Sequence, residues 1–176
     1  MSSAEIESYV ASSGPLPDGL RDELLALWVT VVNSGGAVGF LAPVVPADVE
    51  PVLDAALAQV AGGTSRLVLL RSAGRVAGFG FLLTPATPYM RHWATVARLM
   101  VDPALHGSGC GRALLEGVHD VARSAGLEAL RLTARGGLGL EGFYERLGYA
   151  EVGRVPGAIR VAPGDDRDEI LLHRAL

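Results

Sequence analysis

The sequence predicts a single mixed α/β domain, and three observations support this fold class. Its 176 residues match the size of one domain. Hydrophobic residues make up 49% of the chain and charged residues 19%, a composition that is typical of a globular protein and excludes disorder. Segments with helical spacing of apolar residues alternate with short apolar runs of strand length, without repeats or an internal linker.

The expected elements follow from this periodicity and from the glycines that interrupt it. Residues 1–16 are polar and contain Ser-Ser-Gly-Pro, so we expect a flexible N-terminal arm before one domain over residues 17–176. Two helices come first, and the pairs Gly35-Gly36 and Gly62-Gly63 end them. In chain order, helices are expected over residues 18–34, 46–61, 113–125 and 140–147, and strands over residues 66–70, 76–83, 94–101, 127–133, 149–155 and 169–173.

All 15 basic residues are arginine, and the absence of lysine excludes two chemistries. The phosphate loop of nucleotide hydrolases needs Gly-Lys-Ser/Thr, and Schiff-base catalysis needs a lysine amine. The net charge is −4, and no basic run or stripe of basic and aromatic residues occurs. A surface that follows a phosphate backbone normally shows clustered Lys and Arg, so the sequence predicts no nucleic-acid partner.

The sequence also indicates a cytoplasmic protein. No apolar run approaches the roughly 18 residues that a membrane helix requires, and the polar, acidic N-terminus does not resemble a secretory signal. Cys110 is the only cysteine, which excludes an internal disulfide and fits a reducing compartment. We therefore expect a soluble protein without a membrane partner.

The segment from Asp102 to Leu115 carries the clearest chemical pattern. Gly107, Gly109 and Gly111 lie between an expected strand and an expected amphipathic helix. Glycine allows positive φ and close approach of a ligand, and a helix start offers unpaired N–H groups and the positive end of the dipole. This combination predicts a phosphate or pyrophosphate site, with a glycine-rich turn that binds nothing as the alternative. The spacing differs from Gly-x-Gly-x-x-Gly and so disfavours a nicotinamide cofactor.

Two motifs of this chain resemble those of a known family. The chain reads His106-Gly107-Ser108-Gly109-Cys110-Gly111 after Val101-Asp102-Pro103, and later Gly142-Phe143-Tyr144-Glu145-Arg146-Leu147-Gly148-Tyr149. They resemble the acetyl-CoA-binding loop and the Phe-Tyr-x-x-x-Gly-Phe/Tyr helix end of the GCN5-related N-acetyltransferase (GNAT) family, most strongly over residues 95–155. The resemblance implies a central, mostly antiparallel twisted sheet of about six to seven strands flanked by about four helices, with acetyl-CoA as co-substrate.

A looser resemblance concerns three segments, at residues 36–43, 94–101 and 133–137. They are similar to segments of the tabtoxin-resistance subgroup of the family, which acetylates small toxins or antibiotics. This resemblance implies a small-molecule acceptor, such as an antibiotic or toxin.

The family resemblance also implies roles for individual residues. Tyr144 would be the general acid for the coenzyme A thiolate, because a free tyrosine has a pKa of about 10 and is protonated at neutral pH; a packing role is the alternative. Backbone groups of Leu99, Met100 and Val101 would pair with the pantetheine arm like an additional strand. The pyrophosphate would bind N–H groups of the loop and helix start, at Gly107, Ser108, Gly109, Cys110, Gly111 and Arg112.

Four other residues have polar side chains that invite a chemical role. His106 replaces the Gln or Arg that opens the family's loop, and it either donates to a phosphate or lies on the surface. Cys110 lies where the family carries an aliphatic residue, which predicts packing rather than nucleophilic attack. His92 and His173 are expected to be structural, and no spacing of His, Cys and Asp indicates a metal site.

Two departures from the family pattern leave the general base unidentified. Thr95 occupies the position where family members often carry a glutamate base, and the segment at residues 136–140 lacks the common asparagine. We expect an N-acetyltransferase in which a small-molecule amine attacks the acetyl thioester directly in a ternary complex, in a monomer or homodimer. The alternatives are acetylation of a protein N-terminus or lysine, and an idle acyl-CoA-binding regulatory module.

Overall fold

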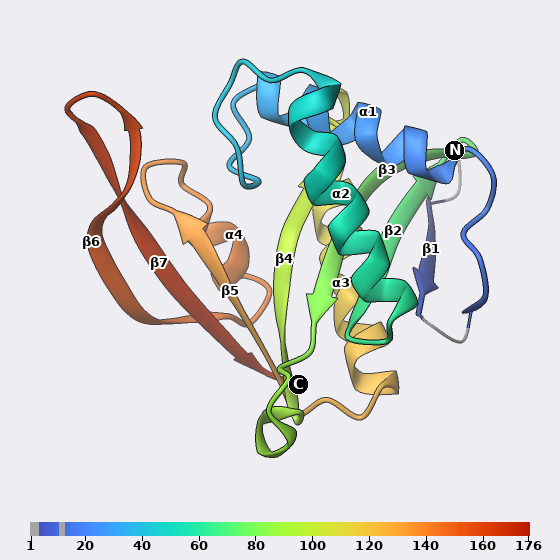
Figure 1. Cartoon of the computed structure of the whole chain (residues 1–176). Coiled ribbons are helices and arrows are strands. Elements are labelled where there is room, and N and C mark those ends of the chain that lie inside the picture. The colour runs from blue at the N-terminus through green and yellow to red at the C-terminus, as the bar shows by residue number, and fades with distance from the viewer. Residues whose placement is uncertain (1–3, 11–12) are drawn as a thin grey trace.

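A seven-stranded sheet forms the centre of the fold in the computed structural model, which describes residues 4–10 and 13–176 (Figure 1). The strand order is β1-β2-β3-β4-β5-β7-β6, and only the β4–β5 pair is parallel. The predicted α/β fold class is confirmed. In chain order the elements are β1 (Ala4–Tyr9), α1 (Leu20–Asn33), α2 (Pro46–Ala61), β2 (Ser65–Ser72), β3 (Arg75–Leu83), β4 (Trp93–Val101), α3 (Cys110–Ser124), β5 (Ala129–Arg135), α4 (Glu141–Glu145), β6 (Ala150–Ala162) and β7 (Asp165–Ala175).

Helices cover both faces of the sheet, with α1 and α2 in front of it and α3 behind it in Figure 1. This explains why β2 is an uninterrupted apolar run rather than an alternating one. Its residues Leu67 and Leu69 pack with the α1–α2 cluster, whereas Val68 and Leu70 pack with the α3 cluster. A strand that is buried on both faces needs apolar side chains at every position. Among the helices of the described residues, none combines the length and the apolar character needed to span a membrane.

The first strand corrects the prediction of an N-terminal arm. Residues 4–9 pair antiparallel with β2, and Arg71 Nε donates to Glu7 Oε1 at 2.9 Å. Behind the strand, Ile6 crosses α3 at Gly117, where an added Cβ would lie 2.7 Å from Ile6 Cδ1. The segment is polar because an edge strand leaves much of its surface in water. Residues 1–3 and 11–12 of the predicted arm lie outside the described residues.

Several element boundaries also differ from the prediction, most clearly in the last three strands. The strand expected over residues 127–133 begins at Ala129, because the N–H group of Leu127 donates to the Ala122 carbonyl at the end of α3. The last two strands are longer than expected and form the exposed hairpin at the left of Figure 1. Their outer halves face water on most sides, so they lack the apolar periodicity that reveals a buried strand.

Candidate active site

The central feature of the site is a gap between β4 and β5. The two parallel strands pair only over Trp93–Thr95 and Ala129–Arg131 and then separate, as Figure 1 shows. Residues 96–101 of β4 therefore have β3 as their only strand neighbour within the described chain. Backbone groups that face the gap are available to an extended ligand, which could bind there as a further strand. Leu99, Met100 and Val101, the predicted pantetheine-binding residues, lie along this part of β4.

A β-bulge in β4 shapes the gap. Phe79 is paired with Met100 but Phe81 with Ala97, so β4 holds one residue more than β3 across this stretch. Arg98 in the bulge has a φ of 52°, a conformation that is uncommon for a non-glycine residue. Gly80 lies opposite, where an added Cβ would come within 2.8 Å of Leu99 Cδ1, so a larger residue would displace the Leu99 side chain.

The glycine loop, residues 106–109, connects β4 to α3. Gly107 and Gly109 have φ values of 78° and 89°, which only glycine adopts without strain. A Cβ at either position would meet nothing within 4 Å, so the space above the loop is open. Gly111 differs, because its φ is not positive and an added Cβ would make only an ordinary contact with Phe143, at 3.7 Å.

The backbone of the loop and of the first turn of α3 forms a set of free donors. Across the described residues, the N–H groups of Gly107, Gly109, Cys110, Gly111 and Arg112 have no hydrogen-bond partner. The N–H group of Ser108 is different, because it donates to the Leu105 carbonyl at 3.2 Å. Five of the six predicted pyrophosphate donors are therefore available to an anion, at the positive end of the α3 dipole.

The side chains of this segment lie mostly on its surface. His106 and Ser108 are exposed, and the Ser108 hydroxyl donates to the Leu105 carbonyl at 2.6 Å. Arg112 is exposed and lies 3.3 Å from Glu116 in an ion pair along α3. Cys110 is half-buried and packs against the apolar cluster under α3, which agrees with the expected packing role.

Tyr144 lies in the short helix α4, beside the start of α3. Its side chain is buried, and its ring contacts Phe143 and Tyr149 edge-on, with centroids 5.2 and 5.7 Å away. Burial raises the pKa of Tyr144 to about 12, so the phenol is protonated at neutral pH. In the described chain the Tyr144 hydroxyl has no hydrogen-bond partner. This hydroxyl is not fully buried, because Ser65 Oγ is the only fully buried side-chain polar atom of the described residues that lacks a partner. The Tyr144 hydroxyl is therefore accessible and can donate to a ligand.

His119 and Arg174 form a hydrogen-bonded group next to α4. The sequence alone did not identify these two residues as part of the site. Arg174 donates to His119 Nδ1 at 3.0 Å and to the Leu147 carbonyl. A guanidinium can only donate, so the His119 proton lies on Nε2, which is 3.2 Å from the Tyr149 hydroxyl. Burial, and then the charge of Arg174, lower the pKa of His119 to about 4, which keeps the ring neutral. A histidine on the apolar face of a predicted helix was the available signal.

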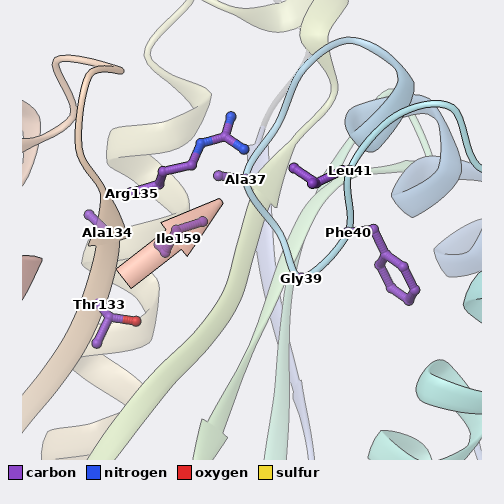
Figure 2. A pocket seen from close by; sticks show the side chains of 8 residues that line it. All are labelled: Ala37, Gly39, Phe40, Leu41, Thr133, Ala134, Arg135 and Ile159. Carbon is purple, nitrogen blue, oxygen red and sulfur yellow. The ribbon is translucent and has the colours of Figure 1, made fainter. Parts of the chain in front are cut away.

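A cavity of about 370 Å³, called the β5 pocket here, lies between the α1–α2 loop and β5. Figure 2 shows Arg135 reaching toward the loop, where it donates to the Gly35 carbonyl at 3.2 Å, and the Phe40 ring turned away from β5. Two of the segments with subgroup resemblance, residues 36–43 and 133–137, thus meet at one cavity. Its lining residues are Ala37, Gly39, Phe40, Leu41, Thr133, Ala134, Arg135 and Ile159.

Thr95, at the position expected for a base, has a cation beside it. Arg131 donates from Nε to Thr95 Oγ1 at 3.1 Å, and its guanidinium lies 3.9 Å from the centroid of the Trp93 ring. His92 is exposed and precedes β4 at the end where β4 and β5 are paired, away from the gap. His173 is exposed on β7, in register with Arg131. Within the described ranges, no three His, Cys, Asp or Glu side chains form a group that could hold a metal ion.

Comparisons with known proteins agree with this geometry. Residues 46–156 match the family model described as "Acetyltransferase (GNAT) domain". The chain is 36% identical over 93 residues to an "IAA acetyltransferase" of Azospirillum brasilense, and the match covers 53% of this chain and 58% of that relative. The chain thus spans little more than half the length of this relative.

Solved structures share the fold over almost the whole chain. The ribosomal-protein-S18-alanine N-acetyltransferase of Escherichia coli matches with a TM-score of 0.69 at 22% identity, covering 98% of this chain and 94% of that one. The protein yncA of Salmonella typhimurium, solved with its cofactor acetyl-CoA, matches with a TM-score of 0.74 at 17% identity and the same coverage, 98% and 94%. At such identities the likeness shows the fold alone.

Proposed function

This chain belongs to the GNAT acetyltransferase family, and on that premise we propose that it transfers an acetyl group from acetyl-CoA to the primary amine of a small molecule. The observation that carries the proposal is the β4–β5 gap. On its β4 side the chain continues into the loop with free N–H donors, and on its β5 side Thr133, Ala134 and Arg135 line a pocket of about 370 Å³. A cofactor and an acceptor can therefore meet from opposite directions.

The cofactor end of the gap suits coenzyme A. The free N–H groups around Gly107 and Gly109 suit the pyrophosphate, because donors at a helix start favour a dianionic group. The pantetheine arm, with two amides, matches the open backbone of Leu99–Val101. The related protein with acetyl-CoA bound supports this choice of cofactor.

In the proposed reaction, the amine nitrogen attacks the thioester carbonyl carbon and forms the C–N bond. The C–S bond then breaks, the amine loses its proton to solvent water, and the departing thiolate takes a proton from solvent. Tyr144 has a pKa of about 12, whereas a thiol has a pKa of about 8.5. Complete transfer of the phenolic proton would be uphill, so Tyr144 acts mainly by donating a hydrogen bond to the developing thiolate.

The amine must arrive neutral, because Thr95 stands where a carboxylate base is expected and has Arg131 as its neighbour. Arg131 beside Thr95 disfavours a second positive charge and lowers the pKa of an ammonium bound nearby. The enzyme would therefore select the free-base form of its acceptor.

The size of the β5 pocket favours a small molecule over a protein. Ligand pockets for small molecules have volumes of about 300–1,000 Å³, and the β5 pocket is at the lower end of this range. The name of the Azospirillum brasilense relative, "IAA acetyltransferase", is also in keeping with a small acceptor.

Steady-state release of coenzyme A tests the proposal, with a panel of small amines and of peptides that carry a free N-terminus or lysine. We expect amine-dependent release with small amines that exceeds the release with peptides. Faster turnover of peptides would favour protein acetylation. Binding of acetyl-CoA without release by any amine would favour an idle binding module.

A further inference from the structure

Arg98, in the bulge of β4, is a half-buried cation without a partner. No described residue forms a hydrogen bond or ion pair with its guanidinium, which instead lies 5.3 Å from the centroid of the Trp28 ring. Arg71, also half-buried, shows the usual arrangement, because it contacts the carboxylates of both Glu7 and Glu23. An arginine stays charged in proteins, and its five donors are expensive to bury unless an acceptor binds them. The guanidinium of Arg98 is therefore free to bind an acceptor group of a ligand.

The position of Arg98 links it to the β5 pocket. Trp28, beneath its guanidinium, lies 5.9 Å from Phe40, which lines the pocket. Leu99 and Val101 pack toward α3, whereas Arg98 faces α1, on the side of the sheet where the pocket lies. Arg98 thus lies on the same side of the sheet as the pocket, next to the stretch of β4 assigned to the thioester.

Two arginines, Arg131 and Arg135, lie on this side of the gap, although the chain has a net charge of −4. Arg135 is the only ionisable residue that lines the pocket, and Arg131 lies beside Thr95. Glu169 is in register with Arg135 on β7, but no ion pair forms between them in the part of the chain that the structure describes. The local field therefore attracts an anion.

We propose that the acceptor is an amine that also carries an anionic group of the carboxylate class, and that Arg98 binds this group; the inference rests on the proposed acetyl transfer. A guanidinium pairs with a carboxylate through two parallel hydrogen bonds, which fixes the orientation as well as the distance. Binding at Arg98 would hold the acceptor beside Leu99–Val101 and direct its amine to the thioester. It would also satisfy the donors that the fold leaves without a partner.

Matched pairs of acceptors test this inference. Each pair is an amino acid and its carboxamide, for example 4-aminobutyrate and 4-aminobutanamide, or methionine and methioninamide, and kcat/KM is expressed per concentration of free amine. We expect the acids to be preferred by about 10-fold to 100-fold, the range of a hydrogen bond to a charged group. In Arg98→Gln the preference should fall to near unity, because kcat/KM should fall far more for the acids than for the carboxamides. Arg98→Lys should keep part of the preference.

Two controls separate this inference from folding and from the proposed function. Arg75→Gln, an exposed arginine at the β2–β3 turn, should change nothing, and Tm of each variant shows whether it folds. Transfer to amines without a preference for acids, or an equal loss for acids and carboxamides in Arg98→Gln, overturns the inference and leaves the acetyltransferase function standing. If no acceptor reacts, the same pairs are tested by Tm of the coenzyme A complex. A larger shift with acids that depends on Arg98 supports the inference, and equal shifts overturn it.

Discussion

The two ends of the β4–β5 gap are built in different ways. The end that we assign to the cofactor would use backbone groups from one continuous stretch, from Leu99 to Arg112. The acceptor end uses side chains from the α1–α2 loop, β5 and β6, together with Arg98 from the bulge. A site made of backbone groups tolerates substitution of side chains but not a change of φ. A site made of side chains changes its specificity when those side chains are substituted. We therefore expect the cofactor end to be fragile at two glycines, and the acceptor end to be open to changes of specificity.

The largest effect is expected from Gly109→Val. A valine at a φ of 89° is strained and would displace the N–H groups to which we assign the pyrophosphate. Saturating acetyl-CoA should raise Tm of the wild type, and this shift should be lost in the variant. Gly111→Ala is the matched control, because its φ is not positive and the added Cβ meets Phe143 at an ordinary 3.7 Å. Equal loss of the shift in both variants would contradict the role of the backbone conformation.

Tyr144→Phe tests the one side-chain hydrogen bond that we assign to the cofactor end, because it removes the hydroxyl and keeps the ring. A lost hydrogen bond to a developing charge lowers kcat by about 10²-fold, and the affinity for acetyl-CoA should hardly change. Single-turnover acetyl transfer gives the first quantity and the Tm shift gives the second. Activity within a factor of two of the wild type would show that Tyr144 acts by packing.

The pH dependence of kcat/KM tests the missing base. Without an enzyme base, the rate should rise about tenfold per pH unit until the free amine predominates. Two acceptors that differ in amine pKa should show limbs displaced by the same difference. A limb that stays near pH 6–7 for both acceptors would indicate a base on the enzyme, and His173, in register with Arg131, would be the first residue to replace.

The smallest effect concerns the buried His119 below α4. Its pKa is about 4 in the folded chain and 6.5 when exposed, so the unfolded chain binds more protons between these values. The free energy of unfolding should therefore fall as the pH drops from 6.5 to 4, by at most about 3 kcal/mol. Urea unfolding at several pH values measures it. His119→Gln should be less stable at pH 7 but flatter through this window, and a wild type with equal stability at pH 6.5 and 4.5 would refute the prediction.

The fold could be predicted largely from the sequence, because most of its elements are encoded by residues within the element itself. The helices α1 and α2 and the hairpin β2–β3 repeat a clear period and end at glycines, so their order and limits follow from the residues themselves. The edge strand β1 and the outer halves of β6 and β7 escaped prediction. Their pairing depends on a partner strand rather than on their own apolar pattern.

The candidate site likewise has one part that depends on local sequence and one part that depends on tertiary contacts. The sequence by itself determined the glycine loop, because Gly107 and Gly109 meet a need for positive φ that lies within the loop. Only the tertiary structure decided that β4 and β5 separate after Thr95, that Arg98 is left without a carboxylate, and that residues 37–41 face β5. These features depend on strand register and on contacts between segments far apart in the chain, and no short window of sequence contains that information.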